Sequence, residues 1–421
     1  MEATSTQRRV RWPRLRPHHR ALTLATALTL AVLVLAPQAG MESAASTTCA
    51  LAPGEGFDEG PAHSDELRPR GVQRSVMIMV DFPDRPARGS AARRAGFFSR
   101  HSDRYFARAS DGRFRLRLSP TRDWVRMPQR WSSYGVARGA PTPVMRHYVE
   151  DAIKAARRAG TDFTGARSVF VVADDNVPAA PTVSQANTFT GLRAGSTPLQ
   201  AAALVFGRAK DDPDWQRGNF VHEAHHFFGL PDLYDIRRGA SARYAGGWDT
   251  MSLAGVSDLL GWHKRKLGWL PDSQVDCVAE PGTSGHTLRA VGTGAGARIV
   301  VVRTGRHTAL VAEARTRTGL DSGICSEGVL LYSVDSRTPT GHGPVRLVDA
   351  HPASRGAWGC PERGPTELAE LSDAPFTPGT GHTFADHGVR VTVTERLGQG
   401  YRVRVTRGED TAETAGGRTP A

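Results

Sequence analysis

The chain has 421 residues, of which 39% are hydrophobic, and it carries a formal net charge of +12. Its length is sufficient for two or three domains, and 45 Gly and 27 Pro indicate a loop-rich globular protein rather than a fibrous or disordered one. Beyond residue 45 the Lys and Arg residues form no dense run with interleaved aromatic side chains, so the charge does not indicate a nucleic-acid partner.

Residues 1–45 have the organisation of an export signal. Six Arg residues precede an uncharged apolar run over residues 21–36, and small residues at 43–45 offer a cleavage site. The apolar run is shorter than the roughly 20 residues needed to span a bilayer, although an uncleaved membrane anchor remains the alternative. We therefore expect a secreted protein with no stable membrane insertion after cleavage.

The next segment, residues 46–70, is rich in Gly, Pro and acidic residues and has no periodicity, which predicts a linker or a short pro-segment. A continuous apolar run then predicts a buried strand at residues 75–80. An aromatic-rich helix is expected around residues 94–109, and an alternating strand at 114–118 follows a Ser-Asp-Gly turn.

The clearest long helix is predicted for residues 143–160, since this stretch has Pro near its start, Gly at its end and an apolar stripe between them. A buried strand at 168–173, a polar loop at 174–193 and an apolar stretch at 201–207 follow. Two acidic clusters in this region make calcium a candidate cofactor, although such clusters more often cap loops. They contain Asp174, Asp175 and Asn176, and Asp211, Asp212 and Asp214.

The most informative motif is His-Glu-x-x-His, formed by His222, Glu223 and His226. Residues four apart share one face of a helix, so the two imidazoles can converge on a metal ion. Glu223 follows the first ligand, where its carboxylate can deprotonate a water molecule on the metal; this is the arrangement of zinc peptidases. His225 faces another side of the helix and is not expected to be a ligand.

Downstream residues extend this motif. Gly229 can break the helix and reverse the chain, because Gly tolerates positive φ, and Asp232 would then return to the metal as a third ligand. Pro231 prevents the helix from continuing. The spacing is that of the long metzincin pattern with Asp in place of the third His. Met251, in a Gly-rich stretch, is predicted to form the Met-turn beneath the zinc site.

Other polar residues near the motif are candidates for supporting roles. Tyr234 and Tyr244 could donate a hydrogen bond to the oxyanion, and either can equally be a packing residue. Asp235 and Asp249 are candidates for orienting the rings of the ligand histidines.

These motifs resemble those of a known family. The run from His222 to residue 235, His-Glu-x-x-His-x-x-Gly-Leu-Pro-Asp-Leu-Tyr-Asp, followed by Gly-Trp-Asp-x-Met251-Ser, is similar to the secreted immune-inhibitor-A-like metallopeptidases. The run Leu-Gly-Trp-His-Lys-Arg-Lys-Leu-Gly-Trp-Leu at residues 260–270 and Asp-Phe-Pro-Asp at 81–84 are also similar. The resemblance implies an extracellular, zinc-dependent peptidase with a metzincin-like catalytic domain, here residues 71–272.

Helical signals end near residue 271, and strands are predicted at 297–303, 308–314, 328–334, 389–394 and 401–406, with a hairpin loop between the last two. This pattern predicts an all-β module, a sandwich, over residues 273–407. Residues 408–421 form a polar tail that is predicted to be disordered. The expected fold class is therefore α+β, with a metzincin-like catalytic domain followed by the β module.

Four cysteines follow the signal segment: Cys49, Cys277, Cys325 and Cys360. An even number in an exported chain predicts two disulfides, and three pairings are possible. We favour Cys325–Cys360 with Cys49–Cys277, because the first pair would close a loop within the C-terminal region. In an alternative, Cys49 stays unpaired and its thiolate binds the zinc, which would keep the enzyme latent.

Together these features predict a secreted zinc endopeptidase with one catalytic zinc on His222, His226 and Asp232 and with Glu223 as general base. We expect protein or peptide substrates and a monomeric chain. One alternative is a zinc hydrolase that acts on a non-protein substrate or a cell-wall peptide. Another is a non-catalytic binding protein with a structural zinc, against which Glu223 argues, since a structural site needs no base.

Overall fold

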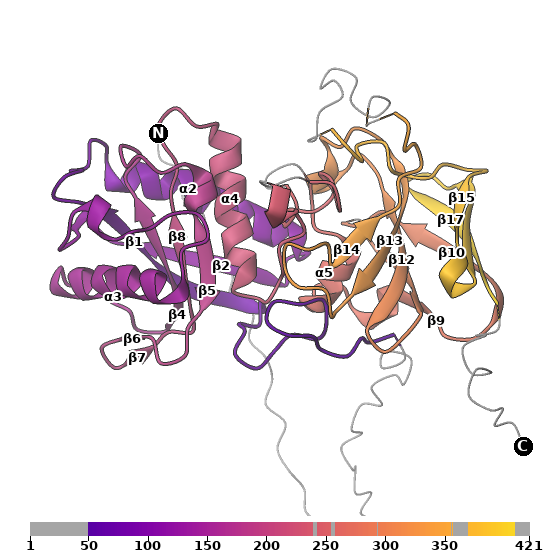
Figure 1. Cartoon of the computed structure of the whole chain (residues 1–421), viewed down its shortest axis with the longest axis horizontal. Coiled ribbons are helices and arrows are strands. Elements are labelled where there is room, and N and C mark those ends of the chain that lie inside the picture. The colour runs from indigo at the N-terminus through magenta and orange to yellow at the C-terminus, as the bar shows by residue number, and fades with distance from the viewer. Residues whose placement is uncertain are drawn as a thin grey trace, which may run out of the picture. The chain divides into compact units, whose positions relative to one another are not determined.

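The computed structural model describes residues 49–238, 242–253, 257–292, 294–354, 356 and 369–408. The predicted signal at 1–45, Cys360 and nearly all of the predicted tail lie outside these residues. Within them the fold is mixed α/β with several sheets and few helices, as Figure 1 shows. None of the described helices combines the length and the apolarity that crossing a membrane would require.

A six-stranded sheet forms the N-terminal half, in the order β2-β1-β4-β8-β5 with β3 beside β1. Its strands are β1 (Gly71–Asp81), β2 (Phe114–Pro120), β3 (Val125–Arg126), β4 (Ala166–Ala173), β5 (Gln185–Thr188) and β8 (Ala201–Val205). The central strands are nearly continuous apolar runs because both faces of the sheet are covered. All neighbours are parallel except β5, which runs antiparallel to β8.

The helices α2 (Ala91–Ala109), α3 (Thr142–Arg158) and α4 (Pro213–His226) cover this sheet. Residues of α3 share a core with alternate β1 side chains such as Ile78, whereas α2 and α4 share another core with Met77. Because successive strand residues point to opposite faces, α3 covers one face and α2 and α4 cover the other (Figure 1). The helices and strands predicted up to residue 173 are thus confirmed, with ends shifted by a few residues.

The edge strand β5 corrects one prediction. The sequence predicts a polar loop over residues 174–193, but Gln185–Thr188 pairs with β8 and is a strand. Its side chains are polar and half-buried, so the sequence carries no strand signal there. A two-stranded hairpin of β6 (Arg193–Ala194) and β7 (Thr197–Pro198) follows it.

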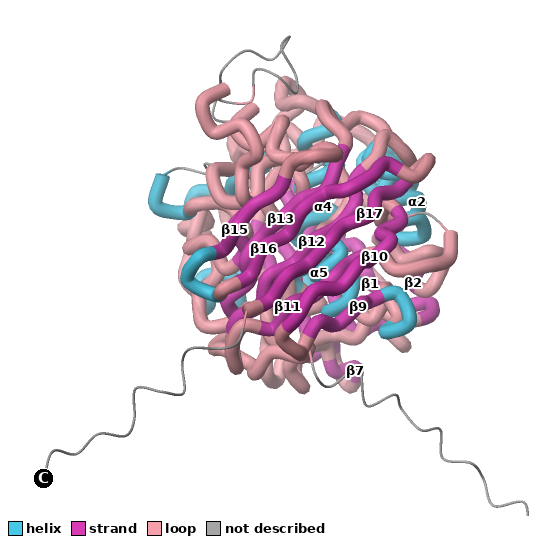
Figure 2. The backbone as a smooth tube through the Cα atoms, turned by 90° about the vertical axis from the view of Figure 1, so that its right-hand side faces the viewer, coloured by secondary structure: helices cyan, strands magenta, loops and turns pink. Residues whose placement is uncertain are grey.

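The C-terminal half contains a five-stranded sheet, in the order β14-β13-β12-β11-β9, and a four-stranded sheet, in the order β10-β17-β16-β15. The bounds are β9 (Val275–Val278), β10 (Gly282–Arg289), β11 (Ile299–Arg303), β12 (Thr308–Arg315), β13 (Gly328–Asp335), β14 (Val345–Leu347), β15 (Gly381–Phe384), β16 (Val389–Arg396) and β17 (Gly400–Arg407). Side chains from both sheets, such as Leu310 and Val403, share one core, and Figure 2 shows the strands running in similar directions. The five strands predicted here are confirmed, whereas β9, β10, β14 and β15 have no clear apolar run.

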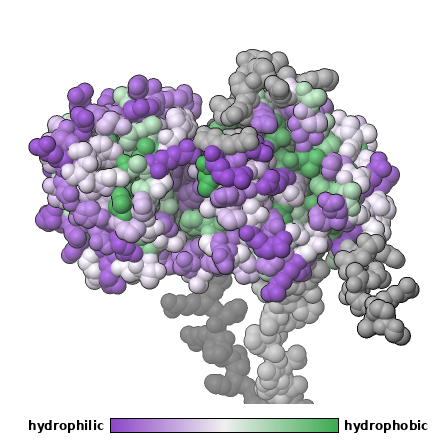
Figure 3. Space-filling model, viewed as in Figure 1, coloured by the Kyte–Doolittle hydropathy of each residue, from purple (hydrophilic) through white to green (hydrophobic). Residues whose placement is uncertain are grey.

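The remaining described elements are short. They are α5 (Gly261–Lys266) and the 3-10 turns Trp131–Ser133, Pro181–Val183, Ile236–Arg238, Asp272–Gln274, Gly319–Asp321 and Ala385–His387. On the face drawn in Figure 3, hydrophilic residues cover most of the surface and hydrophobic residues form separate patches. Among the described large hydrophobic side chains, Val72 and Ile236 are the well-exposed ones, so most of the others contribute to the cores.

The face of the five-stranded sheet that points away from the four-stranded sheet packs against the N-terminal half. Val311 of β12 and Tyr332 of β13 belong to the same core as Met251 and Trp262. Charged groups are also buried here: the Arg315 side chain, which is 0% exposed, contacts Glu313 at 3.0 Å and Asp321 at 2.6 Å. Each charge has a partner of opposite sign, which is the condition under which buried ions are tolerated.

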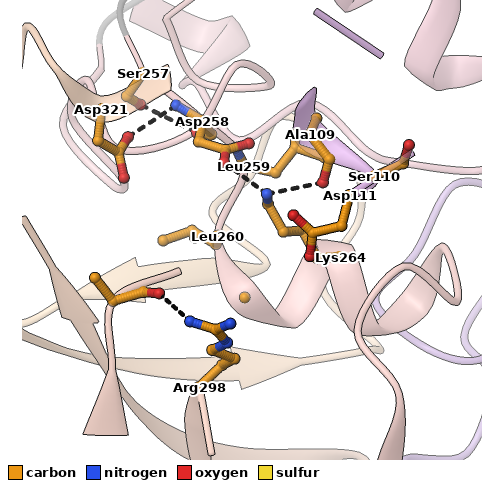
Figure 4. A network of polar contacts seen from close by, with 12 residues as sticks. Ala109, Ser110, Asp111, Ser257, Asp258, Leu259, Leu260, Lys264, Arg298 and Asp321 are labelled. Atoms are coloured by element: carbon orange, nitrogen blue, oxygen red, sulfur yellow. Dashed lines mark hydrogen bonds and ion pairs between the residues drawn. The ribbon is translucent and has the colours of Figure 1, made fainter. Parts of the chain in front are cut away.

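Lys264 of α5 extends this polar network (Figure 4). Its Nζ donates to the carbonyl oxygen of Ala109, at the end of α2, at 2.8 Å and to Asp258 Oδ2 at 2.6 Å. The backbone N–H of Asp258 in turn donates to Asp321 Oδ1 at 3.0 Å. The two halves are therefore joined by hydrogen bonds and ion pairs as well as by a shared apolar core.

The segment predicted as a linker or short pro-segment is packed onto both halves. Cys49 forms a disulfide with Cys277 of β9, which confirms that predicted pairing and excludes the alternative of a free Cys49 thiolate on the metal. Leu51 and Leu67 are buried in the central core. Cys325 is also disulfide-bonded, while its predicted partner lies outside the described residues.

Candidate metal centre

The helix α4 positions the His-Glu-x-x-His residues. Asp212 caps its start, where Oδ1 accepts the backbone N–H of Trp215 at 2.7 Å, and Pro213 occupies the first turn. At the other end Gly229 has a φ of 81°, so the chain turns back as predicted. A Cβ at this position would also meet the end of the Glu66 side chain at about 2 Å, so a larger residue would have to displace that carboxylate as well as adopt a positive φ.

The chain reversal brings Asp232 back to the two histidines. Asp232 Oδ1 lies 3.0 Å from His222 Nε2 and 3.3 Å from His226 Nε2. The two imidazole rings are nearly perpendicular, with centroids 5.0 Å apart, and both residues are 6% exposed. The three side chains thus bring one ligand atom each to a common point, a grouping that could hold a metal ion.

Backbone carbonyls fix the tautomers of both histidines. His222 Nδ1 faces the carbonyl oxygen of Thr250 at 3.0 Å, and His226 Nδ1 faces that of Leu230 at 2.8 Å. Each Nδ1 therefore carries the hydrogen that the carbonyl accepts, and each Nε2, which faces Asp232, is the ring atom left to hold either a proton or a metal ion. This is the protonation pattern that imidazole needs as a metal ligand.

A zinc ion fits this donor set. Asp232 Oδ1 is buried, and among the described residues the two ring nitrogens are the polar atoms that it faces. Ligand atoms that bind a tetrahedral zinc at ~2.0–2.1 Å are about 3.3 Å from one another, close to the separations here. Two imidazole nitrogens and a carboxylate oxygen are also a common ligand set for a catalytic zinc.

The electrostatics of the site favour a positive charge among the three ligands. Burial lowers the pKa of His222, but the Asp232 and Glu223 carboxylates outweigh burial and raise it to about 9. Burial raises the pKa of Asp232, but the two imidazoles outweigh it and hold this pKa well below its usual range. The carboxylate is therefore ionised, and it attracts a proton or a metal cation to the imidazoles.

Glu223 lies beside the ligands and is 4% exposed. Its Oε1 accepts a long hydrogen bond, 3.5 Å, from the Asn219 side chain one turn earlier in α4. Burial raises the pKa of Glu223 above its ordinary value, and the nearby imidazoles oppose this effect. A carboxylate with a raised pKa is a better proton acceptor at neutral pH than an exposed one.

The Met251 turn lies against the ligand loop. Met251 is fully buried, its N–H donates to Asp249 Oδ1 at 2.7 Å, and its carbonyl accepts the N–H of Leu233 at 3.0 Å. The carbonyl of Thr250 in the same turn is the group that His222 contacts. The turn thus supports one imidazole and the chain next to Asp232.

The other candidate residues divide into those at the site and those away from it. The Tyr234 ring stacks on the His222 imidazole, with centroids 6.0 Å apart. Burial, followed by the charges of Asp232 and Glu223, raises the pKa of Tyr234 well above its ordinary value, so the phenol keeps its proton. By contrast, the Tyr244 hydroxyl donates to Asp235 at 3.2 Å, in a cluster with arginines.

Two of the predicted supporting residues make other contacts than those with the histidine rings. Asp235 and Asp249 are not direct partners of the ligand histidines, because the Nδ1 atoms of both histidines face backbone carbonyls and their Nε2 atoms face Asp232. Asp249 instead accepts a hydrogen bond from the backbone of Met251, and its Oδ2 lies 2.9 Å from His263 Nδ1.

His225 faces away from the site, as predicted. Its Nδ1 lies 2.8 Å from the carbonyl oxygen of Val221, and its ring packs among aromatic side chains that include Phe106 and Trp269. Burial lowers the pKa of His225 to about 3, which keeps this imidazole neutral.

The calcium candidates have protein partners. Asp174 accepts the backbone N–H groups of Arg88 and Asn176, and Asp211 is paired with Arg208 at 2.6 Å. Asp212 is the cap of α4 already described. These contacts agree with the alternative in which such acidic clusters cap loops and helices.

Residues 49–67 also reach the site, which the sequence does not suggest. The ring of Phe57 is stacked on the His226 imidazole, with centroids 5.4 Å apart and planes inclined by 28°. The one local sequence signal is Cys49, whose predicted disulfide ties this segment to the body of the protein; the burial of its acidic side chains is seen only in the structure.

No protein-family model matches the chain, and no curated protein matches it.

Proposed function

We propose that this chain is a secreted zinc endopeptidase of the metzincin-like type, with zinc on His222, His226 and Asp232. The observation that carries the proposal is the buried Asp232 Oδ1, which lies within 3.3 Å of two imidazole Nε2 atoms and has no further partner among the described residues. The resemblance to immune-inhibitor-A-like peptidases in the motif supports the same assignment.

The residues of the site take complementary roles in peptide hydrolysis. Zinc, when bound, lowers the pKa of a water molecule and polarises the scissile carbonyl. Glu223 accepts the proton of the attacking water and passes it to the leaving amine. The Tyr234 phenol, which stays protonated, donates a hydrogen bond to the developing oxyanion.

The edge strand β5 favours a peptide over a non-protein substrate. It is the last strand of its sheet, so its outer edge has no partner among the described strands, and it contacts α4. An extended peptide can add to such an edge through backbone hydrogen bonds. This placement would lay a substrate chain alongside the helix that carries Glu223.

A disulfide and an N-terminal signal sequence both support secretion. The Cys49–Cys277 disulfide is of the kind that persists in oxidising, extracellular surroundings. The apolar segment after the N-terminal arginines supplies a signal for secretion.

The test is hydrolysis of casein by the secreted protein, beside hydrolysis of a simple ester. We expect casein cleavage that a zinc chelator stops and that added zinc restores. A metal-independent protease treated with the same chelator is the control for effects on the substrate. Ester hydrolysis without casein cleavage would favour the non-protein alternative, and chelator-resistant cleavage would contradict the proposal.

A further inference from the structure

The segment of residues 49–67 is attached to the body of the protein at both of its ends. At the start Cys49 is bonded to Cys277, and the N–H of Ala52 donates to the carbonyl of Arg306 at 2.9 Å. At the other end the N–H of Leu67 donates to the carbonyl of Phe227, just past α4, at 2.8 Å. The segment thus runs from the β half to the C-terminal end of the helix that carries the candidate metal ligands.

The middle of the segment is held by buried charges. The Glu59 side chain, which is 0% exposed, lies 3.0 Å from His263 Nε2, and the other ring nitrogen of His263 faces Asp249. Lys266 Nζ donates to the carbonyl of Gly229 at 2.7 Å and also to that of Asp58. Removing the segment would leave His263 with one carboxylate partner instead of two, which is unfavourable for a buried ion.

Phe57 precedes these anchored residues directly. Its ring stacks on His226, and the residue is only half-buried although it lies beside an imidazole of the candidate site. Further along, Asp65 accepts a hydrogen bond of 3.5 Å from Thr188 of the edge strand β5. The segment therefore extends from the metal ligands to the strand at which a peptide would bind.

We propose that residues 49–67 are a permanent part of the substrate-binding site, in which Phe57 contacts an apolar side chain of the substrate next to the scissile bond. This inference rests on the proposed peptidase function. A removable pro-segment would need to leave the site, whereas this one is fixed by a disulfide, by buried ion pairs and by core side chains. Aromatic side chains that are not fully buried are common contacts for the apolar parts of a ligand.

The test compares Phe57→Ala and Phe57→Leu with wild type on peptides that differ only at the residues flanking the scissile bond. Glu55→Ala, an exposed position in the same segment, is the matched control. For Phe57→Ala we expect kcat/KM to fall about 10-fold or more for a large apolar residue and less than about 2-fold for Gly. Phe57→Leu should recover part of the loss, and all variants should retain their zinc.

Several outcomes would overturn the inference. An equal change for all peptides would show that Phe57 selects no side chain, and a rise in activity would show that Phe57 covers the site. Active secreted enzyme that lacks residues 49–67, found by intact mass after reduction, would show that the segment is removable. A zinc-loaded wild type that cleaves no peptide would refute the peptidase function itself, and this inference with it.

Discussion

Zinc binding should release a proton from His222. Its pKa is raised to about 9, so in the metal-free protein at pH 7 only about 1% of the molecules have a neutral His222 that can bind metal. Displacing this proton weakens apparent zinc binding on the order of 100-fold at pH 7, or about 3 kcal/mol relative to pH 9 and above. Between pH 6 and 9 the apparent affinity should therefore rise about tenfold per pH unit.

Titration calorimetry measures this effect directly. In buffers that differ in heat of ionisation and do not bind zinc, at least one proton should be released per zinc at pH 7. The exposed His387→Gln variant should behave as wild type. Asp232→Asn removes both a ligand and the charge that raises the His222 pKa, so it should bind zinc more weakly and release fewer protons. Zinc binding with a pH-independent affinity and no proton release would refute this reasoning.

The remaining predictions concern stability. Cys49→Ser should lower the free energy of unfolding by about 2–5 kcal/mol, because the disulfide joins residues separated by 228 positions; a denaturant midpoint equal to that of wild type would contradict this. Arg315→Met should lower the free energy of unfolding, measured in urea, by about 3–5 kcal/mol, because the substitution leaves the buried carboxylates of Glu313 and Asp321 without their partner. An unchanged or higher stability would show that these carboxylates are already neutral. Burial lowers the pKa of His263, but its two carboxylate partners outweigh burial and raise this pKa from 6.5 to about 10. The charged His263 therefore stabilises the folded state fully below pH 6.5, and this stabilisation is lost as the pH rises through 10. Over this pH range we expect the free energy of unfolding of wild type to fall by up to about 5 kcal/mol and that of Glu59→Gln to fall by less. Parallel curves of unfolding free energy against pH for the two proteins would count against the ion pair.

The elements that the sequence predicts well are those with local signals. The strands around β1 and β4 are continuous apolar runs, and α3 has both an apolar stripe and end signals. The approach of Asp232 to the histidines was also predictable, because Gly229 permits the reversal that returns the chain to the helix.

The parts that could not be predicted depend on contacts distant in the sequence. His263 and Glu59 are 204 residues apart, and neither has a neighbour that suggests an ion pair. The supports of the ligand histidines are backbone carbonyls of Thr250 and Leu230, which any residue type could supply. The strand β5 is likewise defined by its pairing with β8 rather than by its side chains.

The most direct test of the proposed function is the Glu223→Gln variant, assayed for bound zinc and for casein hydrolysis beside wild type. The substitution keeps the size of the side chain but removes its ability to accept the proton from water. Glu55→Gln, at an exposed position, is the control. We predict that Glu223→Gln retains one zinc per chain and loses casein hydrolysis, while the control retains both. Hydrolysis by Glu223→Gln at the wild-type rate would contradict the proposed mechanism.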